Sequence, residues 1–99
     1  MTLIRAIRKY QPSIILGNVL NDRHPDHGRA GHLIADAGFL SGLAKVETRD
    51  EQGNLQQKWR PTYVLQYMQD WYHEPDVIID ISDVFEQRMK AVQAYTTQF

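Results

Sequence analysis

An aliphatic run is followed by the start of a helix in the stretch Ile14-Ile15-Leu16-Gly17-Asn18-Val19-Leu20-Asn21-Asp22-Arg23-His24-Pro25-Asp26-His27. The aliphatic centre of residues 13–17 predicts a short buried strand, as found in parallel sheets. Proline is favoured at the first position of a helix, where its missing N–H costs no hydrogen bond. We therefore expect a strand over 13–17, a polar loop over 18–24 and a helix over 25–40.

Two histidines flank the predicted start of this helix. If Pro25 is the first helical residue, His24 is the N-cap and His27 is the third helical residue, and these positions face each other across the first turn. The Asp26 carboxylate lies between them in sequence. In open α/β sheets, ligands bind beyond the carboxyl ends of the strands. Histidine binds metals as the neutral base and titrates near neutral pH, so the pattern suits a metal ligand beside an acid or base.

A purely structural interpretation explains the same residues. His24 would be only a polar cap and His27 only an exposed helical residue, because short His-x-x-His motifs often occur without function. Asp26 would be an acidic residue that the helix dipole favours in the first turn. Both interpretations stay open at the level of these residues.

The rest of the chain predicts a layered, Rossmann-like α/β fold with a largely parallel sheet and flanking helices, because helical and strand-like patterns alternate. The apolar positions of the helix over 25–40 fall on one face: Ala30, Leu33, Ile34, Ala37 and Leu40. The other expected elements are a helix over 2–10, an exposed loop over 44–58, strands over 62–68 and 77–81, and a last helix that begins with an Asp83/Glu86 capping box.

Composition sets limits on the partners of the chain. Its 99 residues fit one small domain, and 11 basic against 12 acidic residues give a formal net charge of −1. Such a balance predicts binding neither to nucleic acid nor to an anionic membrane. It also disfavours a helix-turn-helix DNA-binding module, which we rank third among the candidate functions. The chain has no cysteine, which excludes a thiolate zinc site and is compatible with the cytoplasmic location that we expect.

The motif Arg23-His24-Pro25-Asp26-His27, followed by an Ala/Gly-rich helix, resembles the second motif of the PIG-L/LmbE-type zinc-dependent N-deacetylases. These enzymes act on N-acetylglucosamine conjugates. Further segments resemble the branch that acts in bacillithiol biosynthesis, whose expected substrate is N-acetylglucosaminyl malate. These segments are Ala35–Leu43, Trp59-Arg60-Pro61, Asp76–Ser82 and the run from Tyr95 to Gln98-Phe99.

The resemblance implies a role for each residue of the motif. His27 is the family's third zinc ligand, and His24 stabilises the oxyanion and protonates the leaving amine. Asp26 orients and charges His24. Arg23 is a candidate contact for the substrate's carboxylates, since arginine binds carboxylates through two hydrogen bonds. His32 lies about 140° around the helix from His27 and is expected to pack or face solvent.

The family's first motif, Ala-His-Pro-Asp-Asp, has no counterpart in this sequence. That motif supplies two zinc ligands and the general base. We therefore expect residues 1–99 to form one partial domain, to be inactive alone, and to receive the remaining zinc ligands from a preceding segment. The complete protein is expected to be a homo-oligomer that binds a small amino-sugar conjugate. The alternative is a non-catalytic interaction or structural module derived from the same fold.

Overall fold

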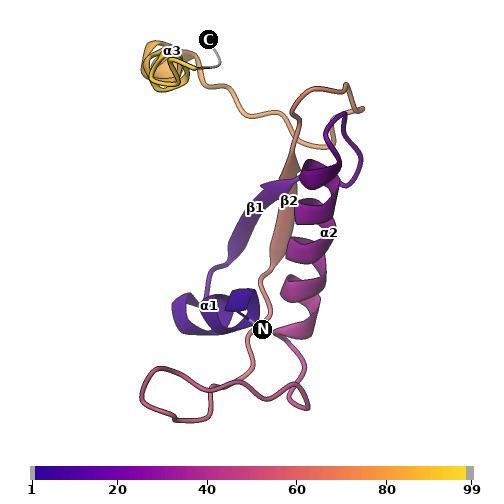
Figure 1. Cartoon of the computed structure of the whole chain (residues 1–99), viewed down its shortest axis with the longest axis vertical. Coiled ribbons are helices and arrows are strands. Elements are labelled where there is room, and N and C mark those ends of the chain that lie inside the picture. The colour runs from indigo at the N-terminus through magenta and orange to yellow at the C-terminus, as the bar shows by residue number, and fades with distance from the viewer. Residues whose placement is uncertain (1, 98–99) are drawn as a thin grey trace.

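The computed structural model describes residues 2–97 and contains three α-helices, two strands and one 3-10 helix in that range (Figure 1). Their bounds are α1 Thr2–Tyr10, β1 Ile14–Asn18, α2 Pro25–Leu40, β2 Tyr63–Tyr67, η1 Ser82–Val84 and α3 Phe85–Gln93. Met1 lies outside the described range, as do Gln98 and Phe99, the end of the run from Tyr95 that resembles the bacillithiol branch. No helix within residues 2–97 has the length and apolar character needed to cross a bilayer.

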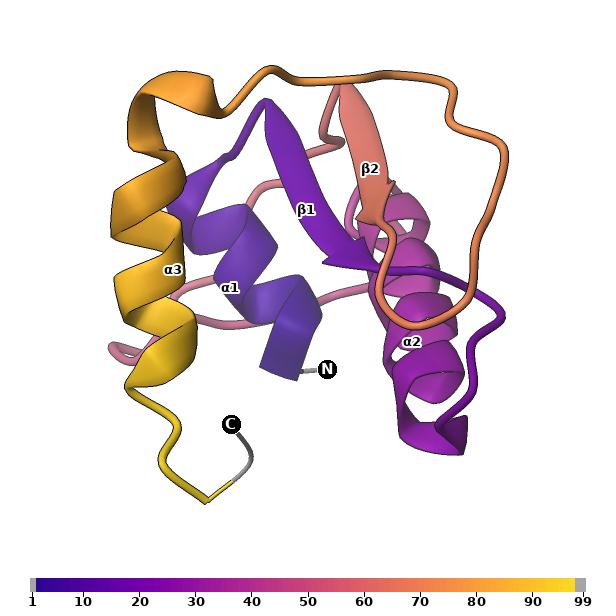
Figure 2. The same ribbon diagram turned by 90° about the horizontal axis from the view of Figure 1, so that it is seen from above.

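The two strands form a parallel pair, which confirms the predicted α/β class. Ile14 pairs with Tyr63 at one end and Asn18 with Tyr67 at the other. Because the strands are parallel, their carboxyl ends lie together, next to the start of α2. Figure 2 shows the two strands side by side, and Figure 1 shows α2 running beside them. The first strand is shifted by one residue from its predicted range, and α2 has its predicted bounds.

Glycines bring α2 close to the strand β1. A Cβ atom added at Gly31 would lie 2.6 Å from the carbonyl oxygen of Val19, so only glycine fits there. Gly17 on β1 contacts Ile34, and Gly38 contacts Val64 on β2. The contact face therefore includes Gly31, Ile34 and Gly38. The predicted apolar stripe is wrong at Leu33, which is 59% exposed.

A small core lies where α1 meets α2. Ile4, Ile7 and Ala37 are buried, and the partly buried Leu40 and Trp59 pack against them. The indole N–H of Trp59 donates to the carbonyl of Pro12, which attaches the segment before β2 to the end of α1. This core joins α1 to α2, to β1 and to the segment before β2.

The strand predicted over 77–81 is wrong. The structure has no strand there, and Val77, Ile78 and Ile79 are exposed. A strand needs a neighbour that pairs with its N–H and C=O groups. This segment instead leads away from the sheet to α3, which among the described elements contacts only η1 (Figure 1).

The predicted capping box at Asp83 and Glu86 is also wrong. The helix α3 begins at Phe85, and its N-cap residue Val84 makes no side-chain capping bond. The Asp80 carboxylate instead accepts hydrogen bonds from the backbone N–H and the hydroxyl of Ser82, which lower the pKa of Asp80. Asp80 therefore accepts a hydrogen bond from the first backbone N–H group of η1, and η1 begins two residues after Asp80.

Candidate metal and catalytic site

His24 is the N-cap of α2, as the sequence predicts. Its backbone is extended, with ψ of 128°, and its Nδ1 atom accepts a hydrogen bond of 3.1 Å from the backbone N–H of Asp26. The backbone N–H of His27 donates to the carbonyl of His24, also at 3.1 Å. The two imidazole rings therefore lie across the first turn, with centroids 5.4 Å apart.

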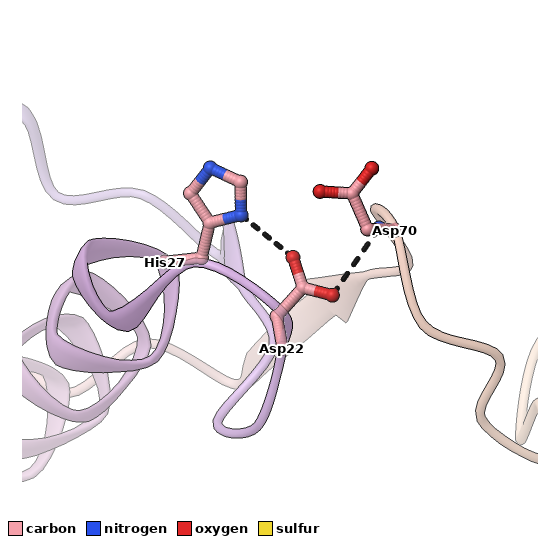
Figure 3. A group of neighbouring side chains, drawn as sticks. All are labelled: Asp22, His27 and Asp70. Carbon is pink, nitrogen blue, oxygen red and sulfur yellow. Dashed lines mark hydrogen bonds and ion pairs between the residues drawn. The ribbon is translucent and has the colours of Figure 1, made fainter.

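His27 is held by a buried carboxylate. Its Nδ1 atom lies 2.6 Å from Oδ2 of Asp22, whose side chain has no exposed surface (Figure 3). The other carboxylate oxygen of Asp22 accepts from the backbone N–H groups of Asp70, at 3.2 Å, and Trp71, at 2.8 Å. The hydrogen bond from His27, assisted by these N–H groups and that of Arg23, lowers the pKa of Asp22 to about 2, although burial opposes the shift.

The two histidines carry their protons on different ring nitrogens. His24 accepts at Nδ1, so the proton of its neutral ring lies on Nε2, where it can be donated. An ionised carboxylate only accepts, so Nδ1 of His27 carries the proton and its Nε2 has the lone pair. The site thus presents one hydrogen-bond donor and one potential metal ligand side by side.

Asp70 lies at the edge of this group. Asp22, His27 and Asp70 each offer one potential ligand atom, and these atoms lie within 4.8 Å of one another. Asp70 also forms an ion pair of 3.4 Å with Arg23, in which both side chains are largely exposed. The carboxylate therefore places the Arg23 guanidinium at the edge of the group that contains His27.

The structure brings all four predicted site residues to the start of α2. Asp26, however, is exposed and pairs with Arg29 at 3.1 Å, while its carboxylate lies 3.9 Å from Nδ1 of His24. At that distance the carboxylate makes no hydrogen bond to the ring. Orientation of His24 in this structure comes from the backbone N–H of Asp26, and a role for its carboxylate stays a prediction.

Asp22 and Asp70 have no role in the predictions made from sequence. Both follow a strand of the parallel pair at its carboxyl end, Asp22 after β1 and Asp70 after β2. That position is where ligands bind in open α/β sheets, so it was a usable signal. His73 forms a 2.7 Å hydrogen bond with the carbonyl of Asn21 and attaches the segment after β2 to the site loop.

A hollow of about 610 Å³ lies beside the site loop. Its lining is mainly apolar, with polar groups from the two segments that follow the strands. The lining includes Val19, Asn21, Tyr67, His73, Val77 and Ile79. Such a mixture of apolar surface and a few polar groups is typical of small-molecule binding sites.

Comparison with known proteins identifies relatives of this chain. The chain is 32% identical, over 98% of its length, to diacetylchitobiose deacetylase of Thermococcus kodakarensis. It is 30% identical to a conserved protein of Thermus thermophilus with a known crystal structure, and the two superpose with a TM-score of 0.87 over 99% of this chain. No family model matches the sequence.

These similarities cover only part of each relative. The chain spans 36% of the length of the deacetylase and 42% of the Thermus chain. The curated relative nevertheless supports the deacetylase resemblance of the sequence motifs, and the structural similarity supports the α/β fold.

Proposed function

We propose that this chain forms part of a zinc-dependent hydrolase of the PIG-L/LmbE type, which removes the acetyl group from an N-acetylglucosamine conjugate. The observation that carries the proposal is the pairing of His24 and His27, with opposite proton positions, at the carboxyl end of a parallel strand pair. The similarity to a diacetylchitobiose deacetylase supports the same reaction class.

The residues present fit a zinc site. A zinc-bound histidine usually donates its other ring N–H to a carboxylate, as His27 does to Asp22. Catalytic zinc takes three protein ligands and keeps one position open. His27 supplies one ligand through Nε2, and the others come from outside the described residues. When bound, the metal polarises the acetyl carbonyl and lowers the pKa of a bound water.

His24 stabilises the negative charge that develops on the acetyl oxygen. Its Nε2–H is free to donate to that oxygen because Nδ1 is occupied by the backbone N–H of Asp26. Delivery of a proton to the departing amine, the role that the sequence motif implies, needs the doubly protonated ring, which gives up its Nε2 proton and returns to the neutral form. In that form Nδ1 also carries a proton, and the Asp26 carboxylate, 3.9 Å from Nδ1, is the partner that the role proposed for Asp26 from the sequence requires.

We infer the substrate from the side chain of Arg23. Its side chain is 69% exposed and pairs with Asp70, at the edge of the group that contains His27. Arginine binds carboxylates through two parallel hydrogen bonds, which suits the malate carboxylates of N-acetylglucosaminyl malate. Diacetylchitobiose is an uncharged sugar and offers Arg23 no such partner.

The test is acetate release by the zinc-loaded complete protein, with N-acetylglucosaminyl malate and diacetylchitobiose as alternative substrates. We expect acetate release from the malate conjugate. Arg23→Gln should raise the KM for this substrate by about tenfold, because the variant loses one charged hydrogen-bond pair. Arg29→Gln is the matched control, because Arg29 is similarly exposed but pairs with Asp26.

Two outcomes would contradict the proposal. A zinc-loaded complete protein that releases acetate from neither substrate would exclude the deacetylase function. Residues 1–99 alone carry one imidazole ligand and should release no acetate, so metal-dependent release by this segment would show that the ligand assignment is wrong.

A further inference from the structure

We propose that Asp22 is a positioning residue that fixes the proton of His27 on Nδ1, and that it is not itself a metal ligand. The proposal deepens the proposed function, because it takes His27 as the residue that binds zinc. Asp22 is a buried carboxylate that the proposed reaction does not otherwise use. It contacts both the candidate ligand and the segment after β2.

The hydrogen bonds of Asp22 argue against direct metal binding. One of its oxygens is 2.6 Å from Nδ1 of His27, and the other accepts from two backbone N–H groups. Two atoms that share a tetrahedral zinc ion at about 2.0 Å each lie about 3.3 Å apart. The shorter separation is that of a hydrogen bond, and both oxygens already have partners.

The same contacts determine which nitrogen of His27 can bind metal. Because the carboxylate accepts the Nδ1 proton, the lone pair of the neutral ring lies on Nε2. In Figure 3 this second nitrogen points away from Asp22. If the proton moved to Nε2, His27 would turn an N–H group toward the metal position and could not bind there.

Asp22 also couples this histidine to the segment after β2. The oxygen that does not face His27 holds the N–H groups of Asp70 and Trp71. His73 adds a hydrogen bond with Asn21, the residue before Asp22. The proton position on His27 and the placement of residues 70–73 therefore depend on one carboxylate.

The variant Asp22→Asn separates positioning from folding. The asparagine oxygen can still accept the N–H groups of Asp70 and Trp71, but its NH₂ group must face His27 and donate. We expect this change to move the proton of His27 from Nδ1 to Nε2. Nitrogen-15 NMR of the imidazole rings, at about pH 8 where free histidine is neutral, reports the position directly.

Asp70→Asn is the matched control. It removes the other carboxylate of the group but leaves the pair between Asp22 and His27, so the proton should stay on Nδ1. In the complete protein, Asp22→Asn should raise the dissociation constant for zinc about 10- to 100-fold, whereas Asp70→Asn should leave it within about threefold. Amide resonances of residues 70 and 71 report whether each variant keeps its fold.

Three results would overturn the proposal. The first is a His27 proton that stays on Nδ1 in folded Asp22→Asn. The second is a proton that moves while zinc affinity is unchanged. The third is a loss of zinc in Asp70→Asn alone, which would make Asp70 the carboxylate that matters. A wild-type protein that binds no zinc would contradict the proposed function, while the NMR measurement still decides what Asp22 does to His27.

Discussion

The polar segment 44–58 is better attached to the core than the apolar segment 77–81, the opposite of what their compositions predict. The polar segment is attached to the core by hydrogen bonds, whereas the apolar segment is uncovered. Apolar residues favour burial only when another surface is there to cover them. Available partners, more than residue type, therefore decide which segments of this chain are fixed.

Buried Arg8 fixes the polar segment. Its guanidinium donates to the carbonyl of Ser41 at 3.1 Å, to the hydroxyl of Thr48 at 2.8 Å and to the carbonyl of Leu43 at 2.9 Å. The Thr48 hydroxyl in turn donates to the side chain of Gln56 at 2.8 Å. A single charged group on α1 thus holds the start of the loop directly and, through Thr48, holds Gln56 near its end.

Nothing comparable covers the apolar segment within the described residues. Ile78 is 82% exposed, and Leu16 and Tyr63, on the sheet face away from α2, are also exposed. The accessible surface of 8071 Å² exceeds by about 2,300 Å² the roughly 5,800 Å² typical of a folded monomer of this mass. An excess of that size matches the area buried in obligate interfaces.

The variant Arg8→Met should release the polar segment and so remove its difference from 77–81. Methionine keeps the helix propensity and the apolar stem but removes every donor, so we expect a loss of about 3 kcal/mol in the free energy of unfolding. Chemical denaturation measures the loss, and limited proteolysis should cut within 44–58. Lys9→Met, next to it in α1, removes an exposed pair with Glu51 and an exposed contact with the Tyr10 ring, and should cost no more than about 1 kcal/mol in the free energy of unfolding. Equal effects of the two variants would refute the role given to Arg8.

Acid should weaken the contacts that Asp22 makes to His27 and to the segment leading to 77–81. The pKa of Asp22 is about 2 in the folded chain, against about 3.9 for a free carboxyl, so its stabilising effect is complete above pH 4. The effect is lost as the pH falls from about 4 toward 2, because the protonated oxygen no longer accepts the Nδ1 proton of His27 and the neutral carboxyl accepts the two backbone N–H groups more weakly. NMR should show the amide protons of Asp70 and Trp71 shifting together in this range. Shifts that are absent, or that persist in Asp22→Asn, would contradict the assignment.

The smallest expected effect on stability comes from the uncovered apolar surface. Leu16→Thr combined with Ile78→Thr changes exposed side chains, so the free energy of unfolding should change by no more than about 0.5 kcal/mol. Association should nevertheless fall, because exposed apolar patches drive it. In size-exclusion chromatography, the elution of the 99-residue variant chain should shift from that of the wild type toward that of a monomer. A wild-type chain that is already a cooperative monomer would show that this surface needs no cover.

Local pattern predicted most of the elements. Pro25 and the aliphatic run before it were sufficient to place β1 and α2, because they act within a few residues. The segment 77–81 could not be placed in this way. Its residues favour a strand, but whether a strand forms depends on a neighbour that the described residues do not supply.

The site was predictable in part for the same reason. His24 and His27 belong to one turn, so their spacing alone indicated that they lie together. Asp22 and Asp70 meet only because β1 and β2 are parallel neighbours, and a separation of 48 residues along the chain conceals this proximity. The burial of Arg8 likewise depends on carbonyls that lie 33 and 35 residues away along the chain.

Whether His27 binds the metal while His24 acts beside it is decided by the zinc content of two variants of the complete protein. His27→Ala should lose zinc because, of the two paired histidines, only His27 presents a lone pair at the site. His24→Ala should keep zinc and lose turnover by about 100-fold or more, the typical effect of removing one oxyanion donor. Equal zinc content in the wild-type protein and His27→Ala would contradict this division of roles.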